Sequence, residues 1–130
     1  MKTTINYNGI IITLESEYVG TATPWGGEYV RDQHNIKVTI DDKDISFNYF
    51  CNNDLGENDL IFAFYFFLSD GISYIDYQMI DDFQDAFGYS KVSECLKAYN
   101  GCMEAYYKWT EFTDIDIFEI NNWLQDNYNL

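Results

Sequence analysis

Apolar and polar residues alternate along the first 50 residues, which is the pattern of strands with one buried face. Three sets of alternating residues carry the pattern: Ile10, Ile12 and Leu14; His34, Ile36, Val38 and Ile40; and Ile45, Phe47 and Tyr49. The Asn8-Gly9 pair is a strong signal for a two-residue hairpin turn, so a further strand precedes it. The stretch TPWGGEYVRDQ, residues 23–33, is predicted to be a loop, and DDKD, residues 41–44, a turn. The pattern therefore predicts an antiparallel β-sheet of about four strands over residues 3–50.

After residue 50 the apolar spacing changes to that of helices. Nine consecutive apolar residues, 60–68, suit either a helix capped by Asn58 or Asp59 or a buried strand, and both readings stay open. Apolar stripes predict helices over residues 77–87 and 93–109, with Tyr106 on the seam of the second. A capping-box pair, Thr113 and Asp116, then opens a last helix with four residues on one face: Ile117, Ile120, Leu124 and Tyr128. The fold class is α+β, a sheet followed by a layer of three to four helices, and the length predicts a single domain, residues 1–130.

Acidic residues dominate the charge of the chain. It has 22 acidic and seven basic residues, which give a net charge of −15. Residues 41–88 hold eleven of the acids, with Lys43 as their single base. Such a field repels nucleic acid and anionic membranes and attracts basic protein surfaces. We therefore expect a basic protein as the partner, and neither direct nucleic-acid binding nor membrane binding.

Cysteine usage and the short apolar runs predict an intracellular protein. Cys95 and Cys102 lie seven residues apart on a predicted helix, about 10 Å along its axis, which is too far for a disulfide. Together with Cys51 they make an odd number, as expected of free thiols in a reducing compartment. The longest apolar run has nine residues, against the roughly 20 that span a bilayer. The N-terminus has no signal-peptide pattern.

The chain has no pattern specific to catalysis or to a cofactor. His34 is its one histidine, and its place on the apolar face of a predicted strand indicates a core or edge residue rather than a catalytic base. The cysteines have no paired C-x-x-C spacing for zinc, and neither a phosphate-binding glycine loop nor an EF-hand pattern is present. The many carboxylates leave a metal-dependent hydrolase or a glycosidase-like pair open. The prediction is a protein that binds and does not catalyse, with no cofactor and no metal.

Carboxylates can imitate the phosphates of nucleic acid. A domain of 130 residues is roughly 35 Å across, and that length of duplex DNA carries about 20 charges. The 22 acids of this chain come close to that number. Eight acids of its acidic middle are the candidate partner-binding residues: Asp54, Glu57, Asp59, Asp70, Asp76, Asp81, Asp82 and Asp85. The alternative is that these carboxylates face water and serve solubility alone.

Two tryptophans are candidates for an apolar contact with a partner. Trp25 lies in the predicted loop, and Trp123 lies off the main apolar stripe of the last predicted helix. Large rings in such positions anchor protein interfaces. They also commonly cover the edge of a core, so both readings stay open.

A longer pattern resembles a group of known sequences. It runs through HNIKVTI, ISFNYF, an acidic loop, LIFAFYFFLSD, FQDAFGY and KVSECLKAY, over about residues 34–108, and F-x-x-x-FGY before a serine-started helix is its most recognisable part. The pattern is similar to that of small phage and prophage proteins of uncharacterised function. Cys95 and Leu96 stand where the group tends to have small or basic residues, and the tail after Trp109 lies outside the resemblance. The resemblance implies a viral or mobile-element origin, a place in the bacterial host cytoplasm, and no catalytic residues.

Charge and resemblance together favour an inhibitor of a host defence enzyme, because small acidic proteins of this origin are often similar to such inhibitors. Defence nucleases have positively charged channels for nucleic acid, which an acidic decoy can fill. The leading hypothesis is an anti-CRISPR protein that blocks a Cas effector through an acidic, nucleic-acid-mimicking surface. The alternatives are an anti-restriction protein that blocks a restriction enzyme, and a non-catalytic interaction or virion-assembly module.

Overall fold

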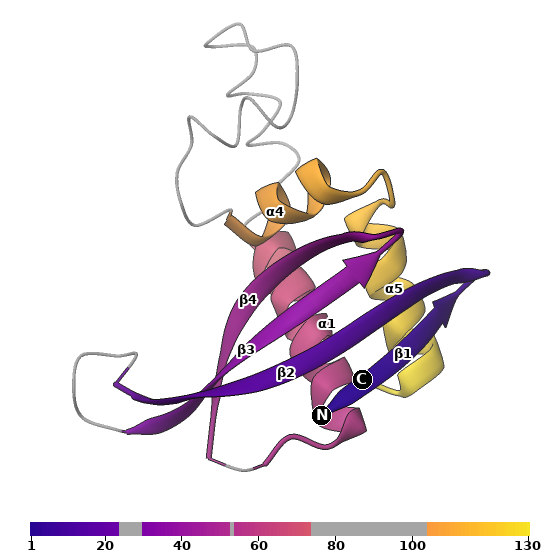
Figure 1. Ribbon diagram of the computed structural model, residues 1–130. Coiled ribbons are helices and arrows are strands. Elements are labelled where there is room, and N and C mark those ends of the chain that lie inside the picture. The colour runs from indigo at the N-terminus through magenta and orange to yellow at the C-terminus, as the bar shows by residue number, and fades with distance from the viewer. Residues whose placement is uncertain (24–29, 53, 74–103) are drawn as a thin grey trace, which may run out of the picture. The chain divides into compact units, whose positions relative to one another are not determined.

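A four-stranded sheet precedes three helices in the described part of the chain (Figure 1). The structure is a computed structural model that describes residues 1–23, 30–52, 54–73 and 104–130. The strands are β1 (Lys2–Tyr7), β2 (Ile10–Ala22), β3 (Arg31–Ile40) and β4 (Lys43–Cys51), and the helices are α1 (Glu57–Ser73), α4 (Glu104–Phe112) and α5 (Ile117–Tyr128). The predicted α+β class is confirmed.

The sheet is an antiparallel meander in the order β1-β2-β3-β4. Two-residue turns join β1 to β2 and β3 to β4. Asn8 and Gly9 have φ angles of 50° and 93°, and Asp41 and Asp42 have φ angles of 50° and 65°. Positive φ at both central residues is the geometry that matches the twist of a tight hairpin, and asparagine, aspartate and glycine adopt it most readily. The predicted turn at Asn8-Gly9 is confirmed. The turn predicted over residues 41–44 is confirmed at Asp41 and Asp42 only, because β4 begins at Lys43.

The second and third strands are longer than their side chains predict. The predicted loop over residues 23–33 is wrong at its end, because β3 begins at Arg31, and β2 extends to Ala22. Backbone hydrogen bonds carry this part of the ladder, and they do not depend on side-chain alternation. A bulge interrupts the register between Tyr18 and Gly20, where Gly20 has a φ of 123°.

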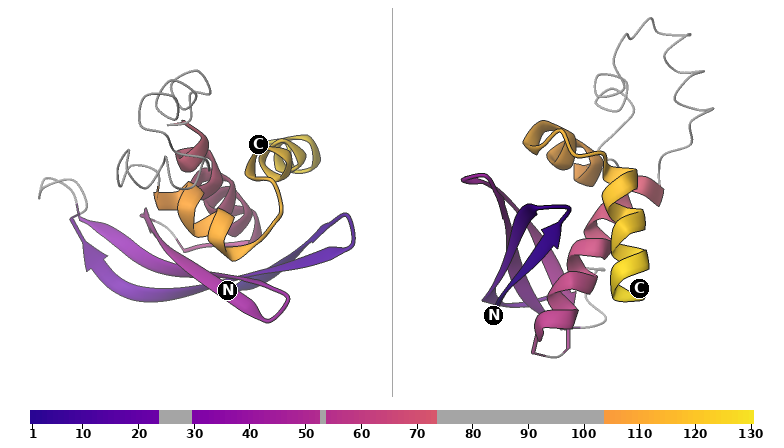
Figure 2. Two further views of the ribbon diagram at one scale, coloured as in Figure 1. Left: turned by 90° about the horizontal axis from the view of Figure 1, so that it is seen from above. Right: turned by 90° about the vertical axis from the view of Figure 1, so that its right-hand side faces the viewer.

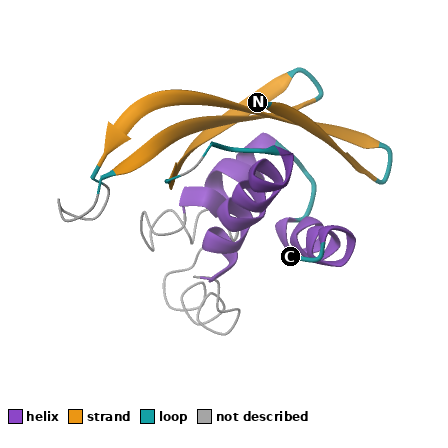
Figure 3. Cartoon of the chain, turned by 90° about the horizontal axis from the view of Figure 1, so that it is seen from below, coloured by secondary structure: helices purple, strands orange, loops and turns teal. Residues whose placement is uncertain are grey.

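The chain forms two compact units, Met1–Phe64 and Tyr65–Leu130. In the first unit one face of the sheet is buried together with the residues that begin α1 (Figure 3). The buried apolar residues of this unit are Ile5, Tyr7, Ile12, Leu14, Ile36, Val38, Ile40, Phe47, Leu55, Leu60, Ile61, Ala63 and Phe64. The alternation predicted for one sheet face is therefore confirmed. The expectation of a single domain stays a prediction.

Residues 60–68 lie in a helix, which settles the reading that the sequence left open. The predicted caps are wrong, because α1 begins at Glu57 and the carbonyl of Gly56 accepts the first helical bond from Leu60 at 3.1 Å. The Asp59 carboxylate accepts a bond from the Gly56 amide at 2.9 Å. Asp59 lies in the first turn of the helix and accepts the amide hydrogen of Gly56, the residue before the helix. The acidic residue of a capping box makes the same kind of bond.

In the second unit, the last part of α1 lies beside α5. The side-chain amide of Asn121 donates to the Ser69 hydroxyl at 3.0 Å, and that of Gln125 donates to the Tyr65 hydroxyl at 2.6 Å. Helix α4 lies at a steep angle to α5, and a short connection joins it to the start of α5 (Figure 2). The two side-chain bonds hold the last part of α1 against α5.

At Tyr106, which was predicted to lie on the packed seam of its helix, the buried face of α4 differs from the prediction. The predicted helix over residues 93–109 extends to Phe112, and its buried residues are Ala105, Trp109 and Phe112, while Tyr106 is half-buried. The buried face centres on Trp109 and not on Tyr106, because the Trp109 ring has the larger apolar area to bury. The start of this predicted helix and the predicted helix over residues 77–87 lie outside the described residues.

Helix α5 begins one residue after Asp116, which is its N-cap. The Asp116 carboxylate accepts bonds from the Phe118 amide at 2.8 Å and the Glu119 amide at 3.1 Å. The predicted capping box is therefore wrong in its assignment, because the Thr113 hydroxyl bonds to the Ile115 amide instead. The predicted face is confirmed by three buried residues, Ile117, Ile120 and Leu124, and Tyr128 at its end is half-buried.

Candidate functional site

Three of the predicted partner-binding acids lie together where α1 begins. We call Asp54, Glu57 and Asp59 the α1 acidic start, and the side chains of all three are exposed. The Asp59 carboxylate accepts a bond from the Gly56 amide, and the exposed side chains of Asp54 and Glu57 extend the acidic surface beside it. This group is the part of the predicted acidic surface that the described residues include. Asp70 lies on α1, and Asp76, Asp81, Asp82, Asp85 and Trp25 lie outside the described residues.

One member of the α1 acidic start, Asp59, acts on the neighbouring strand β4. Burial raises the pKa of the Tyr49 phenol above its ordinary value of 10.0, and negative charge at Cys51 and Asp59 raises this pKa further. The raised pKa keeps the Tyr49 phenol in its neutral form.

Trp123 is half-buried on α5. Its ring lies edge-on to Tyr128, with the ring centroids 6.0 Å apart, and its backbone carbonyl accepts a bond from the Asn127 side chain at 2.8 Å. Part of the ring thus covers the end of its own helix. The role of Trp123 in partner binding stays a prediction.

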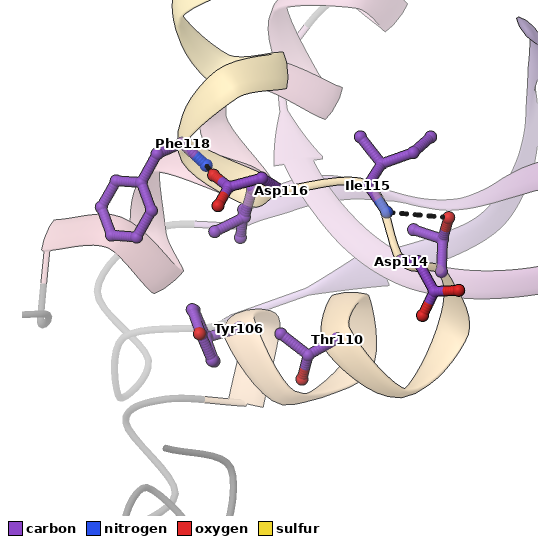
Figure 4. Close-up of a pocket in the computed structure, with 8 residues that line it drawn as sticks. Tyr106, Thr110, Asp114, Ile115, Asp116 and Phe118 are labelled. Carbon is purple, nitrogen blue, oxygen red and sulfur yellow. Dashed lines mark hydrogen bonds between the residues drawn. The ribbon is translucent and has the colours of Figure 1, made fainter. Parts of the chain in front are cut away.

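A hollow of about 250 Å³ lies where α4 turns into α5 (Figure 4). We call it the α4–α5 hollow. Tyr106 and Thr110 reach it from α4, and Asp116 and Phe118 reach it from the start of α5. The remaining lining residues are Thr113, Asp114, Ile115 and Ile117. Its lining offers carboxylate and hydroxyl oxygens and no lysine or arginine, so it suits a cationic side chain better than a phosphate.

Two acids that were not predicted to bind a partner, Asp114 and Asp116, line this hollow. Glu111 and Glu119 lie close to them in the sequence, and all four side chains are exposed within nine residues. Residues 109–119 contain no lysine or arginine. A count of charges in short windows would have found this segment, which lies after the acidic middle of the chain on which the prediction concentrated.

Asp116 is expected to matter for stability, whether or not a partner uses the hollow. Replacing Asp116 by alanine leaves two amides at the start of α5 without their acceptor, so we expect the free energy of unfolding to fall by about 1 kcal/mol. Urea denaturation followed by circular dichroism measures this change. Asp114→Ala, at an exposed position in the same connection, removes the same charge without removing a cap and should change stability by less than about 0.5 kcal/mol. Equal losses in the two variants would contradict the assignment of Asp116 as the cap.

His34 is buried, as predicted, and only 7% of its side chain is exposed. Its ring lies edge-on to Tyr18 at a centroid distance of 5.6 Å. Among the described residues its Nε2 atom has no hydrogen-bond partner. Within the same residues no cluster of three or more histidine, cysteine or acidic side chains is arranged to hold a metal ion. Cys51 forms no disulfide with any residue that the structure describes, and Cys95 and Cys102 lie outside those residues.

Comparison with known proteins gives no relative for this chain. No family model, curated protein or solved structure matches it. None of the helices that the structure describes is long and apolar enough to cross a membrane. The resemblance to phage proteins therefore stays a prediction.

Proposed function

We propose that this protein is a non-catalytic inhibitor of a bacterial defence enzyme, in the first place an anti-CRISPR protein that blocks a Cas effector. It acts in the host cytoplasm and presents carboxylates where the effector would bind nucleic acid. Its partner is a basic protein channel rather than nucleic acid itself. An anti-restriction activity would use the same chemistry on a restriction enzyme.

The exposure of the acids is the observation that carries this proposal. Of the fourteen acidic side chains whose exposure is described, all but Asp32 are exposed. One of them, Glu15, pairs with Lys37 at 3.8 Å, and both side chains of that pair are 48% exposed. Exposed carboxylates in such excess over bases make a strongly negative surface, which attracts a positively charged channel from a distance.

Inhibition of DNA cleavage and its dependence on salt test the proposal. A purified Cas effector with its guide RNA is mixed with the protein before or after target DNA is added. A decoy should inhibit only when it is added first, because bound DNA already fills the channel. Its affinity should fall at least about tenfold between 50 and 200 mM salt, since the contact is made between charges. Binding that does not respond to salt or to DNA would contradict a nucleic-acid-mimicking surface.

Activity on a restriction enzyme, without activity on Cas effectors, would assign the alternative target. If neither class of enzyme is inhibited, the charge serves solubility and the inhibitor proposal is wrong. A set of effectors from several CRISPR types, assayed beside a restriction enzyme, separates these outcomes.

Charge reversal at the α1 acidic start should weaken the inhibitor. The variant Asp54→Lys with Glu57→Lys turns two attractive charges into repulsive ones, and about 1 kcal/mol for each position corresponds to a loss of affinity of about tenfold or more. Asp59 is left unchanged because its carboxylate holds the Gly56 amide. The measurement is the inhibition constant in the cleavage assay.

A matched control separates this surface from net charge. Asp44→Lys with Asp126→Lys changes the net charge by the same amount at two other exposed positions. We expect this control to lose clearly less affinity than the variant at the α1 acidic start. Equal losses would mean that overall charge matters and that the α1 acidic start does not contact the effector. Circular dichroism confirms that both variants are folded.

A further inference from the structure

Strand β2 extends past the strand beside it. Strand β1 pairs with β2 from Ile10 to Glu15, and the Ser16 amide then donates to the Met1 carbonyl at 2.9 Å. From Glu17 to Ala22, β2 is paired with β3 on one side and with none of the described residues on the other. Figure 1 shows β1 running along only part of β2. We call residues 17–22 the open β2 edge.

The open β2 edge presents backbone groups and exposed side chains together. In an antiparallel ladder, successive residues direct their backbone groups to opposite sides. Ser16 donates away from β3, so the register places the amides of Tyr18 and, after the bulge, Thr21 on that same outer side. Tyr18 is 57% exposed and Val19 is 50% exposed. Unpaired strand edges with exposed apolar side chains are ready templates for another strand.

The neighbouring register shows which charge fits this edge. Glu15 lies opposite Lys2 on β1 and opposite Lys37 on β3, and the Lys37 ammonium lies 3.8 Å from its carboxylate. Glu17, two residues further along the same face, lies opposite Asn35 on β3, with its other side open. A lysine or arginine on an added strand would lie beside Glu17 as Lys2 lies beside Glu15. Opposite charges at directly paired positions stabilise a sheet.

We propose that the open β2 edge binds an extended segment of the basic partner protein, which adds to the sheet as a fifth strand in line with β1. A lysine or arginine of that segment pairs with Glu17, and the next side chain, which is apolar, packs against the Tyr18 ring. The inference rests on the proposed function for the basic character of the partner. Six residues of strand span about 20 Å, a common strand length, so a short segment is sufficient.

The charge of the chain argues against a second copy as the occupant. Each chain has a net charge of −15, so two copies repel one another. Residues 17–22 of a second copy also contain no lysine or arginine that could pair with Glu17. The bulge at Val19 also increases the local twist, which discourages long, flat pairing between identical edges. A short basic strand is not repelled by the negative charge of this chain, and it is too short to be affected by the increased twist.

The first test uses three synthetic peptides of seven residues with blocked ends. One alternates lysine and valine, one alternates glutamate and valine, and the third is the lysine peptide with methyl groups on all of its backbone nitrogens. With ¹⁵N-labelled protein, the lysine peptide should shift the NMR signals of residues 17–22 and slow the hydrogen exchange of the Tyr18 and Thr21 amides. Its affinity should exceed that of the glutamate peptide at least tenfold. The methylated peptide should lose binding, because it lacks donors for the strand edge.

The second test reverses the charge at Glu17. Glu17→Lys should weaken binding of the lysine peptide about tenfold and strengthen binding of the glutamate peptide. Asp126→Lys makes the same charge change at an exposed position on α5 and should alter neither affinity by more than about twofold. Shifts at residues other than 17–22, equal binding of the lysine and glutamate peptides, or full binding of the methylated peptide would overturn the proposal. So would signals of residues 17–22 that broaden with protein concentration when no peptide is present, because a second copy would then be the occupant.

The peptide experiments contain no Cas effector, so they test the edge separately from the inhibitor proposal. Inhibition that persists undiminished in Glu17→Lys would overturn the edge as the contact and leave the inhibitor proposal standing. Peptide binding at the edge, with no inhibition of any defence enzyme, would support the edge and overturn the inhibitor proposal.

Discussion

Replacing Trp109 by alanine is expected to lower the free energy of unfolding by about 3–5 kcal/mol. The Trp109 side chain is fully buried in the second unit, and its indole nitrogen donates to the Ile115 carbonyl at 2.8 Å. The ring lies edge-on to Phe112 at a centroid distance of 5.8 Å. Alanine would leave a large cavity, and the Ile115 carbonyl would lose its hydrogen-bond donor. Both the packing of the unit and the connection between α4 and α5 would therefore be less stable.

Two further variants keep the Trp109 prediction testable even if the alanine variant does not fold. Trp109→Phe retains most of the ring but loses the bond to Ile115, and it should cost about 1–3 kcal/mol. Trp123→Ala removes a half-buried ring and should cost less than Trp109→Ala. Urea unfolding followed by circular dichroism gives all three values. A smaller loss for Trp109→Ala than for Trp123→Ala would contradict the burial of Trp109.

Gly71→Ala is expected to destabilise the protein, although alanine normally stabilises a helix by about 1 kcal/mol relative to glycine. A methyl group on Gly71 would lie 2.7 Å from the backbone nitrogen of Tyr106 and 3.2 Å from its Cα atom. Since these are backbone atoms, no rotamer change can relieve the overlap, and α1 and α4 would have to move apart. We expect a loss of about 1–3 kcal/mol.

Thermal unfolding of Gly71→Ala beside Asn122→Ala measures this effect. Asn122 is exposed on α5, so alanine there tests helix propensity without a packing change and should be neutral or slightly stabilising. A melting temperature for Gly71→Ala at or above that of the unchanged protein would mean that α1 and α4 do not approach closely at this point.

The sites differ in how far the sequence predicts them. The acids at Asp54, Glu57 and Asp59 were predicted as a surface, because a run of charged residues without bases is readable from the sequence and such residues seldom become buried. The acids near the α4–α5 hollow could have been predicted from the sequence in the same way. The hollow itself could not be predicted, because it depends on the turn between α4 and α5.

The open β2 edge could not be predicted from the sequence. Strand β2 has no apolar alternation after Leu14, and its length follows from pairing with β3. The open part is defined by where β1 stops relative to β2, and this depends on the register of two strands. Register is a property of the pair, which a side-chain pattern along one strand specifies only in part.

The sequence by itself determined the features that depend on neighbouring residues: the alternation of the strands, the positive-φ turns at Asn8-Gly9 and Asp41-Asp42, and the excess of exposed charge. Tertiary structure decided the features that depend on distant residues. Residues 60–68 form a helix, Trp109 lies at the centre of the buried face of α4, and Gly71 packs against the backbone of Tyr106. Each of these outcomes depends on packing between residues that are far apart in the sequence. The local preferences of individual residues do not specify such packing.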